Sequence, residues 1–156
     1  MYWNDALGAA IEVSIAMVGF AGIVAAVGRR GAGDWNPLDQ LRLRILLTAG
    51  GVAGAFAFFP FVLLDTGLAP ELCWRIGTGV MALWFIGIRI YRQRQATRMG
   101  LTPFMPLPFF LIVHLPIIMA LAINTIWLGD SWPYVLGVVL QLFTAFITFV
   151  RLLLDS

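Results

Sequence analysis

Residues 6–27, ALGAAIEVSIAMVGFAGIVAAV, form an apolar run in which Glu12 is the only charged residue. At a rise of about 1.5 Å per residue, a helix of this length crosses the roughly 30 Å hydrocarbon core of a bilayer. The run lacks a positively charged beginning and is longer than the hydrophobic region of a signal peptide, so we expect a retained span. The whole chain agrees, because 61% of its residues are hydrophobic and only 12% are charged. With a mean hydropathy of +0.92, the sequence predicts an integral membrane protein.

Four more apolar segments follow the first, and polar connections that contain proline and glycine separate them. We place these segments at residues 45–64, 72–91, 107–128 and 134–154. The chain of 156 residues has room for about five such helices and no room for a soluble domain beside them. We therefore predict an all-α integral membrane protein with about five transmembrane helices in a single transmembrane domain, residues 1–156. The third span is the weakest, because it needs Arg75 and Arg89 to extend toward opposite interfaces.

The basic residues indicate the orientation, because arginine and lysine accumulate in cytoplasmic loops. With five spans and the N-terminus outside, nine of the ten basic residues fall in the cytoplasm. These nine are Arg29, Arg30, Arg42 and Arg44 in the first loop, Arg89, Arg92, Arg94 and Arg98 in the third, and Arg151 near the C-terminus. We therefore expect the C-terminus in the cytoplasm and the protein in a bacterial cytoplasmic (inner) membrane.

Composition also excludes several kinds of chemistry. All ten basic residues are arginine, so no lysine is present to form a Schiff base with retinal or pyridoxal phosphate. A single cysteine, Cys73, cannot form a disulfide within the chain, and a single histidine, His114, cannot supply a histidine-rich metal site or two axial haem ligands. No catalytic motif is present, and the arginines lack the interleaved aromatic residues of a nucleic-acid site. We expect no cofactor, no metal, no nucleic-acid partner and no enzymatic activity.

Glu12 is the first candidate functional residue, about 9 Å inside the outer end of its span. At 100° per residue it shares a helix face with small residues, whereas Val13, Met17, Phe20 and Val24 point the other way. The small residues are Gly8, Ala16, Gly19, Gly22 and Ala26. The carboxyl group is therefore expected to face a neighbouring helix or a pore. It either binds a proton or cation, or it is a protonated or ion-paired group that locks two helices together.

Further polar residues fall at a similar depth in other spans. Arg75, Thr78, Asn124 and Gln141 each lie roughly 5–10 Å inside the outer end of their own segments. They predict a polar cluster in the outer third of the membrane, with Glu12 and Arg75 as the natural ion pair. The cluster is either a site for an ion or small solute, or a set of polar contacts that join the helices.

Two prolines and one histidine mark further positions of interest inside the spans. Pro116 and Pro60 each predict a kink, because proline removes a backbone hydrogen bond. His114, two residues before Pro116, either relays protons or hydrogen-bonds a neighbouring helix. Gly50 and Gly54 have the spacing that allows another helix to approach closely.

The arginines of the third loop also suggest partners. Four arginines lie at or just after the cytoplasmic end of the third span, namely Arg89, Arg92, Arg94 and Arg98. The simplest explanation for them is the orientation of the chain in the membrane. At this position they could also hold anionic lipid headgroups. The other expected partners are the lipid bilayer, a second copy of the chain or another membrane protein.

One segment resembles a known family. Residues 7–19, LGAAIEVSIAMVG, are similar to the glutamate-bearing first span of small multidrug exporters. The resemblance covers one helix of a family that has four, and the remaining motifs of that family have no counterpart in this chain. No functional residue is carried over from it.

Three functions are compatible with these features. The first is a homo-oligomeric ion or proton channel or transporter. A single chain of this length is too short to enclose an ion path by itself, whereas several identical copies can enclose one. The second is a non-catalytic membrane subunit or assembly partner of a larger complex. The third is a membrane enzyme with a polar cleft near Asp65, Glu71 and Arg75. We favour the first, because Glu12 shares its helix face with small residues.

Overall fold

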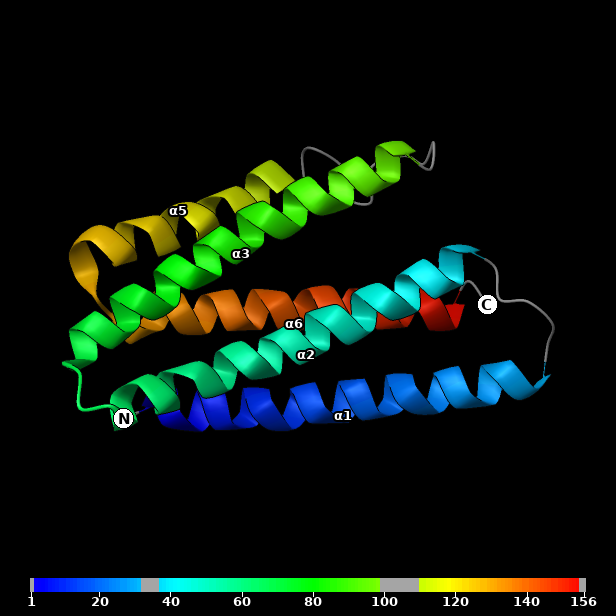
Figure 1. Cartoon of the computed structure of the whole chain (residues 1–156), viewed down its shortest axis with the longest axis horizontal. Helices are drawn as coiled ribbons and strands as arrows, with labels where there is room; N and C mark the ends of the chain where they lie inside the picture. The colour runs from blue at the N-terminus through cyan, green and yellow to red at the C-terminus, as the bar shows by residue number, and fades with distance from the viewer. Residues whose placement is uncertain (1, 32–36, 99–109, 155–156) are drawn as a thin grey trace. The chain divides into compact units, whose positions relative to one another are not determined.

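The computed structural model describes residues 2–31, 37–98 and 110–154, and all statements below on helices, contacts and burial refer to these ranges. Their regular structure is entirely helical (Figure 1). The elements are α1 (Tyr2–Gly31), α2 (Pro37–Asp65), α3 (Pro70–Arg98), the π-helix η1 (Phe110–His114), α5 (Leu115–Ile123), the π-helix η2 (Asn124–Leu128) and α6 (Ser131–Leu154).

Four of the described helices are long and apolar enough to cross a membrane. Their spans are Trp3–Ala26, Gln40–Asp65, Pro70–Gln95 and Ser131–Leu153. A shorter apolar helical segment, Ile112–Leu128, lies where the sequence predicts the fourth of five spans. The structure thus supports an all-helical membrane protein with four long apolar helices. The fifth crossing and the orientation of the termini remain predictions.

The chain divides into two compact units. Unit 1 comprises residues 1–59 and 138–156, and unit 2 comprises residues 60–137. The division falls inside α2, between Phe59 and Pro60, and inside α6, between Gly137 and Val138. We describe each unit by itself, and the single transmembrane domain remains a prediction.

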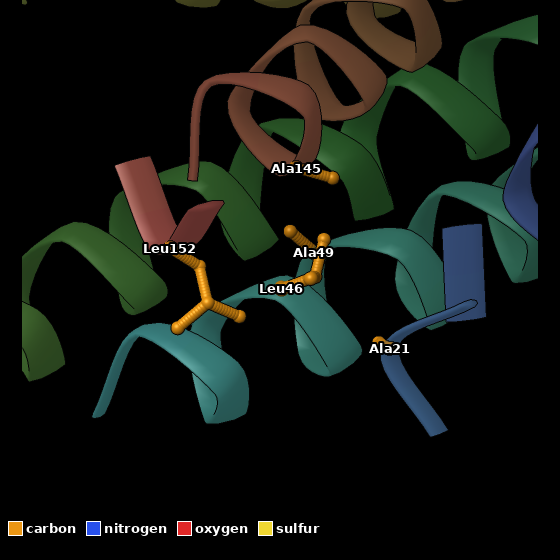
Figure 2. Packing of buried hydrophobic residues seen from close by; sticks show 5 residues of the cluster. All are labelled: Ala21, Leu46, Ala49, Ala145 and Leu152. Carbon is orange, nitrogen blue, oxygen red and sulfur yellow. The ribbon is translucent and has the colours of Figure 1, made fainter. Parts of the chain in front are cut away.

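The core of unit 1 is built mainly from alanine. Figure 2 shows how α1, α2 and α6 contribute to one buried cluster, which consists of Ala21, Leu46, Ala49, Ala145 and Leu152. Met17, Val24 and Phe149 pack against this cluster, and the rings of Phe20 and Phe149 meet edge to face with centroids 5.1 Å apart. Small side chains such as these let helices approach closely. The face of α1 that points toward the interior of the unit carries Met17, Ala21 and Val24.

Two glycines of α2 bring that helix close to α1. A Cβ atom on Gly50 would lie 3.1 Å from Cγ2 of Val18, and one on Gly54 would lie 3.1 Å from Cβ of Ser14. Because residues four apart share a helix face, both glycines face α1. The two helices therefore meet at a distance that larger side chains would not permit.

Unit 2 is built around α3. This helix packs against α5 and η2, which run beside it in the opposite direction (Figure 1). The packed face of α3 buries Trp74, Thr78, Met81 and Phe85. The first turns of α6 also belong to this unit and pack against α3. The ring of Tyr134 is buried there, and its centroid lies 5.8 Å from that of the Trp74 ring.

The two prolines differ in their helical surroundings. Pro116 lies in the first turn of α5, immediately after η1, where a missing N–H group costs little. The backbone bonding therefore changes from π to α just before this proline. Pro60 is buried inside α2, which continues as a helix to Asp65. Bending at either proline remains a prediction.

Candidate functional site

A buried hydrogen-bond network joins α3 to η2 in unit 2. Oγ1 of Thr78 lies 3.0 Å from Oγ1 of Thr125, and Nδ2 of Asn124 donates a long bond of 3.5 Å to Oγ1 of Thr78. Thr78 and Asn124 are fully buried. Each threonine hydroxyl also bonds its own helix, Thr78 to the carbonyl of Trp74 at 2.7 Å and Thr125 to that of Leu121 at 2.8 Å. Such bonds satisfy hydroxyl groups inside an apolar bundle.

Asn124 also closes the turn between η2 and α6. Its Nδ2 donates to the backbone carbonyl of Asp130 at 2.9 Å, and its Oδ1 accepts from the backbone N–H of Asp130 at 2.9 Å. Between them lies Gly129, whose φ of +72° is a left-handed conformation that glycine adopts readily. The N–H of Gly129 donates to the carbonyl of Asn124 at 3.0 Å. The side chain of Asn124 thus pairs with both backbone groups of one turn residue.

Arg75 caps the end of η2. Its Nη2 donates to the carbonyl of Trp127 at 3.1 Å, and a cation at a helix C-terminus is favoured by the helix dipole. Gly129 leaves room for the guanidinium, because a Cβ atom on this residue would lie 3.2 Å from Nε of Arg75. Among the described residues, Nε has no hydrogen-bond partner.

The structure therefore joins three of the predicted cluster residues, Arg75, Thr78 and Asn124, at one end of unit 2. Glu12 and Gln141 belong to unit 1, so their place in the cluster and the Glu12–Arg75 ion pair remain predictions. Sequence reasoning missed Thr125 and the backbone of Asp130. Thr125 follows Asn124 directly, so its depth in the membrane was a usable signal.

Glu12 is exposed on the surface of α1. Only 17% of the most apolar window of α1 is buried, against 39% for α2, 39% for α3 and 44% for α6. Cβ atoms on Gly8, Gly19 and Gly22 would meet nothing within 4 Å, and Ala16 on the same face is exposed. This surface, which we call the Glu12 face, is left open by the described part of the chain. The close packing predicted for the three glycines does not occur within the described part of the chain.

Unit 1 buries further polar side chains. Ser14 and Gln141 are 2% and 3% exposed, and the Oγ of Ser14 and the Nε2 of Gln141 have no hydrogen-bond partner in the described structure. Thr144 and Thr148 instead bond the carbonyls of Leu140 and Thr144 on their own helix, at 3.0 and 2.8 Å. Gln141 therefore lies on a polar side of α6.

His114 lies at the opposite end of unit 2 from Arg75. It is half-buried at the end of η1 and interacts electrostatically with Arg89 and Arg92 on α3. These two arginines are also half-buried, whereas Arg94 and Arg98 are exposed.

No group of three or more metal-binding side chains occurs in the part of the chain that the structure describes. Cys73 is buried, and its Sγ contacts the carbonyl of Leu68 at 3.8 Å. The bonded network of unit 2 can hold helices together, whereas the Glu12 face carries an exposed carboxyl group. Comparison with protein-family models, curated proteins and solved structures found no match to this chain.

Proposed function

We propose that this protein is a homo-oligomeric ion or proton channel or transporter of a bacterial cytoplasmic membrane, and that its copies meet along the Glu12 face. One observation carries the proposal: Glu12 is exposed within the span Trp3–Ala26, the least buried of the four long apolar helices. Placing a charged side chain at the centre of a lipid-facing helix costs about 2.5–3.5 kcal/mol on insertion scales. Contact with water or with another protein chain removes most of this cost.

The neighbours of Glu12 suit contact between copies. Gly8, Ala16 and Gly19 add little bulk, so a second helix backbone can approach closely. Most homo-oligomers have closed symmetry, and cyclic symmetry brings identical faces around one axis. Glu12 carboxylates near such an axis would repel one another when ionised, and they would share protons or hold a cation. This is the chemistry that a proton or cation path requires.

A second function competes with this one, that of a non-catalytic membrane subunit. The network of Arg75, Thr78 and Asn124 supports it, because most of these polar groups bond one another or nearby backbone atoms. Such bonds join helices and form no path. On this alternative the Glu12 face receives a helix of another protein that carries a basic residue. Neither function assigns catalytic activity to the chain.

Flux through proteoliposomes tests the role of Glu12. We expect purified wild-type protein to dissipate an imposed ion or proton gradient, and Glu12→Gln to reduce that flux about ten-fold or more. Asp5→Asn is the matched control, because Asp5 is also an exposed carboxylate of α1 but lies about 10 Å nearer its N-terminus. It should keep wild-type flux. Equal flux in wild type and Glu12→Gln would remove Glu12 from the mechanism.

Cross-linking tests the contact between copies. A cysteine at Ala16 lies on the Glu12 face, whereas one at Ala21 lies in the core of unit 1. The native Cys73 is buried and can remain. We expect Ala16→Cys to form a disulfide-linked dimer in native membranes and Ala21→Cys to stay monomeric. A monomeric mass in detergent, absence of flux and recovery with another membrane protein would together favour the subunit function.

A further inference from the structure

One face of α6 carries a row of buried polar side chains inside unit 1. We call it the polar face of α6, and it consists of Gln141, Thr144 and Thr148. Their side chains are 3%, 7% and 1% exposed. Residues three, four and seven positions apart share a face of a helix, so the three side chains follow one another along α6. Polar groups are thus enclosed in the mainly apolar interior of the unit.

This row begins deep within an apolar span. Gln141 belongs to the span Ser131–Leu153 and lies about 15 Å along the helix from Ser131. The hydrocarbon core of a bilayer is about 30 Å thick, so a helix that crosses it holds Gln141 near its middle. Lipid chains offer no hydrogen bonds there. The polar groups of Gln141 and its neighbours therefore need partners inside the protein.

The two threonines use their hydroxyl hydrogens within α6 itself. Oγ1 of Thr144 donates to the carbonyl of Leu140 at 3.0 Å, and Oγ1 of Thr148 donates to the carbonyl of Thr144 at 2.8 Å. A hydroxyl group has one hydrogen to donate and two lone pairs that accept. Each threonine oxygen can therefore still accept a hydrogen bond from another molecule.

The side-chain amide of Gln141 has a donor to offer. Its Nε2 atom is buried and has no hydrogen-bond partner among the described residues. A buried N–H group without a partner loses the hydrogen bonds that it made to water in the unfolded chain. Thr144 lies one turn further along the polar face, where Cβ atoms are about 5–6 Å apart. A donor on Gln141 and an acceptor on Thr144 are thus separated by a distance that one small molecule can bridge.

The chemistry of the two groups determines what can bridge them. None of the buried polar side chains in the described part of the chain is charged, so an ion bound here would lack a compensating charge. A cation would also be repelled by the N–H donor of Gln141, and an anion by the oxygen of Thr144. A neutral molecule that accepts one hydrogen bond and donates another suits both groups. It must be small, because Ala145, the next residue of α6, belongs to a closely packed cluster.

We infer that Gln141 and Thr144 form an internal binding site for a water molecule. The water accepts a hydrogen bond from Nε2 of Gln141 and donates one to Oγ1 of Thr144. Buried waters in proteins bind where about two to four polar groups can hold them, and apolar cavities stay dry. The site goes beyond the proposed function and does not depend on it, because Glu12 is exposed on α1 whereas Gln141 is buried.

Nuclear magnetic resonance can detect this water directly. The full-length isotope-labelled protein is held in deuterated detergent micelles, and magnetisation transfer from water to side-chain amides is measured. Asn124 is the matched control, because it is also a buried carboxamide but its Nδ2 donates to the carbonyl of Asp130 at 2.9 Å. It also lies beside the hydroxyl of Thr78, so transfer relayed through a threonine hydroxyl affects both amides. We expect transfer to Gln141 to be about five-fold or more stronger than transfer to Asn124.

Paired valine variants test the acceptor. Thr144→Val and Thr148→Val each replace a buried hydroxyl by a methyl group, and each removes a bond to a carbonyl four residues earlier. Only Thr144 lies one turn from Gln141. Thr144→Val should therefore reduce transfer to Gln141 about five-fold or more, and Thr148→Val should reduce it less than about two-fold. Gln141→Met should remove the signal and so confirm its assignment.

Three outcomes would overturn the site. Absence of transfer from water to Gln141 in the wild-type protein would exclude a bound water, and this measurement needs no variant to fold. Equal transfer to Gln141 and Asn124 would indicate relay through threonine hydroxyls. Equal losses in Thr144→Val and Thr148→Val would remove Thr144 from the site. None of these measurements depends on ion flux, so the site and the proposed function can fail separately.

Discussion

Gly77 offers a direct test of how α6 packs onto α3. A Cβ atom on Gly77 would lie 2.8 Å from Cε2 and 3.2 Å from Cδ2 of Tyr134. Tyr134 is fully buried and also packs against Trp74, so its rigid ring cannot move aside easily. Gly77→Ala must therefore shift the ring or separate the two helices. Overpacking of this kind costs about 1–3 kcal/mol.

Gly87→Ala is the matched control on the same helix. A Cβ atom on Gly87 would meet nothing within 4 Å. Replacing glycine by alanine inside a helix gains about 0.8–1.0 kcal/mol from backbone propensity, and this gain is common to both variants. The difference in unfolding free energy between Gly87→Ala and Gly77→Ala therefore isolates the contact with Tyr134, which we expect to cost about 1–3 kcal/mol.

The assay is equilibrium unfolding in mixed micelles, with sodium dodecyl sulfate titrated into protein in dodecyl maltoside and helicity followed by circular dichroism. A double-mutant cycle with Tyr134→Leu adds a second condition, because the shorter side chain removes Cε2 and should relieve most of the Gly77→Ala penalty. If Gly77→Ala is as stable as Gly87→Ala, or if Tyr134→Leu leaves its penalty unchanged, the packing of α6 on α3 described above is incorrect.

Three further predictions follow from the turn, the network and the topology. Gly129→Ala should destabilise the protein more than Gly67→Ala in the same unfolding assay: both glycines have positive φ, but only Gly129 has neighbours, including the carbonyl of Glu71 3.2 Å from a built Cβ atom. Asn124→Leu should cost about 0.5–1.5 kcal/mol for each of the two hydrogen bonds to Asp130 that it removes, and equal unfolding curves for variant and wild type would contradict this. Membrane-impermeant labels at the two termini should react from opposite sides, and reaction from one side would contradict five spans.

Hydropathy was sufficient to predict much of the fold. Apolar runs placed helices where α1, α2, α3 and α6 occur. The helix α2 begins at Pro37, before the apolar segment 45–64, and proline is favoured at the first position of a helix. The π-helices η1 and η2 could not be predicted in this way. Over so few residues, apolar periodicity cannot distinguish backbone hydrogen bonds between residues five apart from those between residues four apart.

The packed face of α1 could not be predicted from the sequence. Small residues lie on both sides of this helix, with Ser14 and Ala21 on one and Ala16 and Gly19 on the other. In a soluble protein the polar face would point to water, but a membrane helix is apolar all round. Periodicity therefore identifies two faces and gives no reason to choose between them. The structure turns Ala21 inward and leaves Glu12 exposed.

Depth was a better guide than residue type for the polar side chains. Counting helical rise assigns Thr78 and Asn124 to one level of the membrane. In the structure, Nδ2 of Asn124 lies 3.5 Å from Oγ1 of Thr78. The same count included Glu12 and Gln141, which unit 1 holds. Depth fixes one coordinate of a residue along the membrane normal, and the other two depend on which helices are neighbours.

The polar side chains of this protein thus fall into two classes, those that are hydrogen-bonded inside the structure and those that are exposed. Asn124 has partners within hydrogen-bond distance on both its oxygen and its nitrogen, so removing it should change stability before it changes any transport. Glu12 is exposed and lies in open space on its helix, so Glu12→Gln should leave stability nearly unchanged and alter whatever binds there. Side chains whose loss costs function and not stability mark a site, because a fold does not depend on contacts it does not make. Measuring unfolding and flux on the same two variants therefore separates the structural network from the functional face.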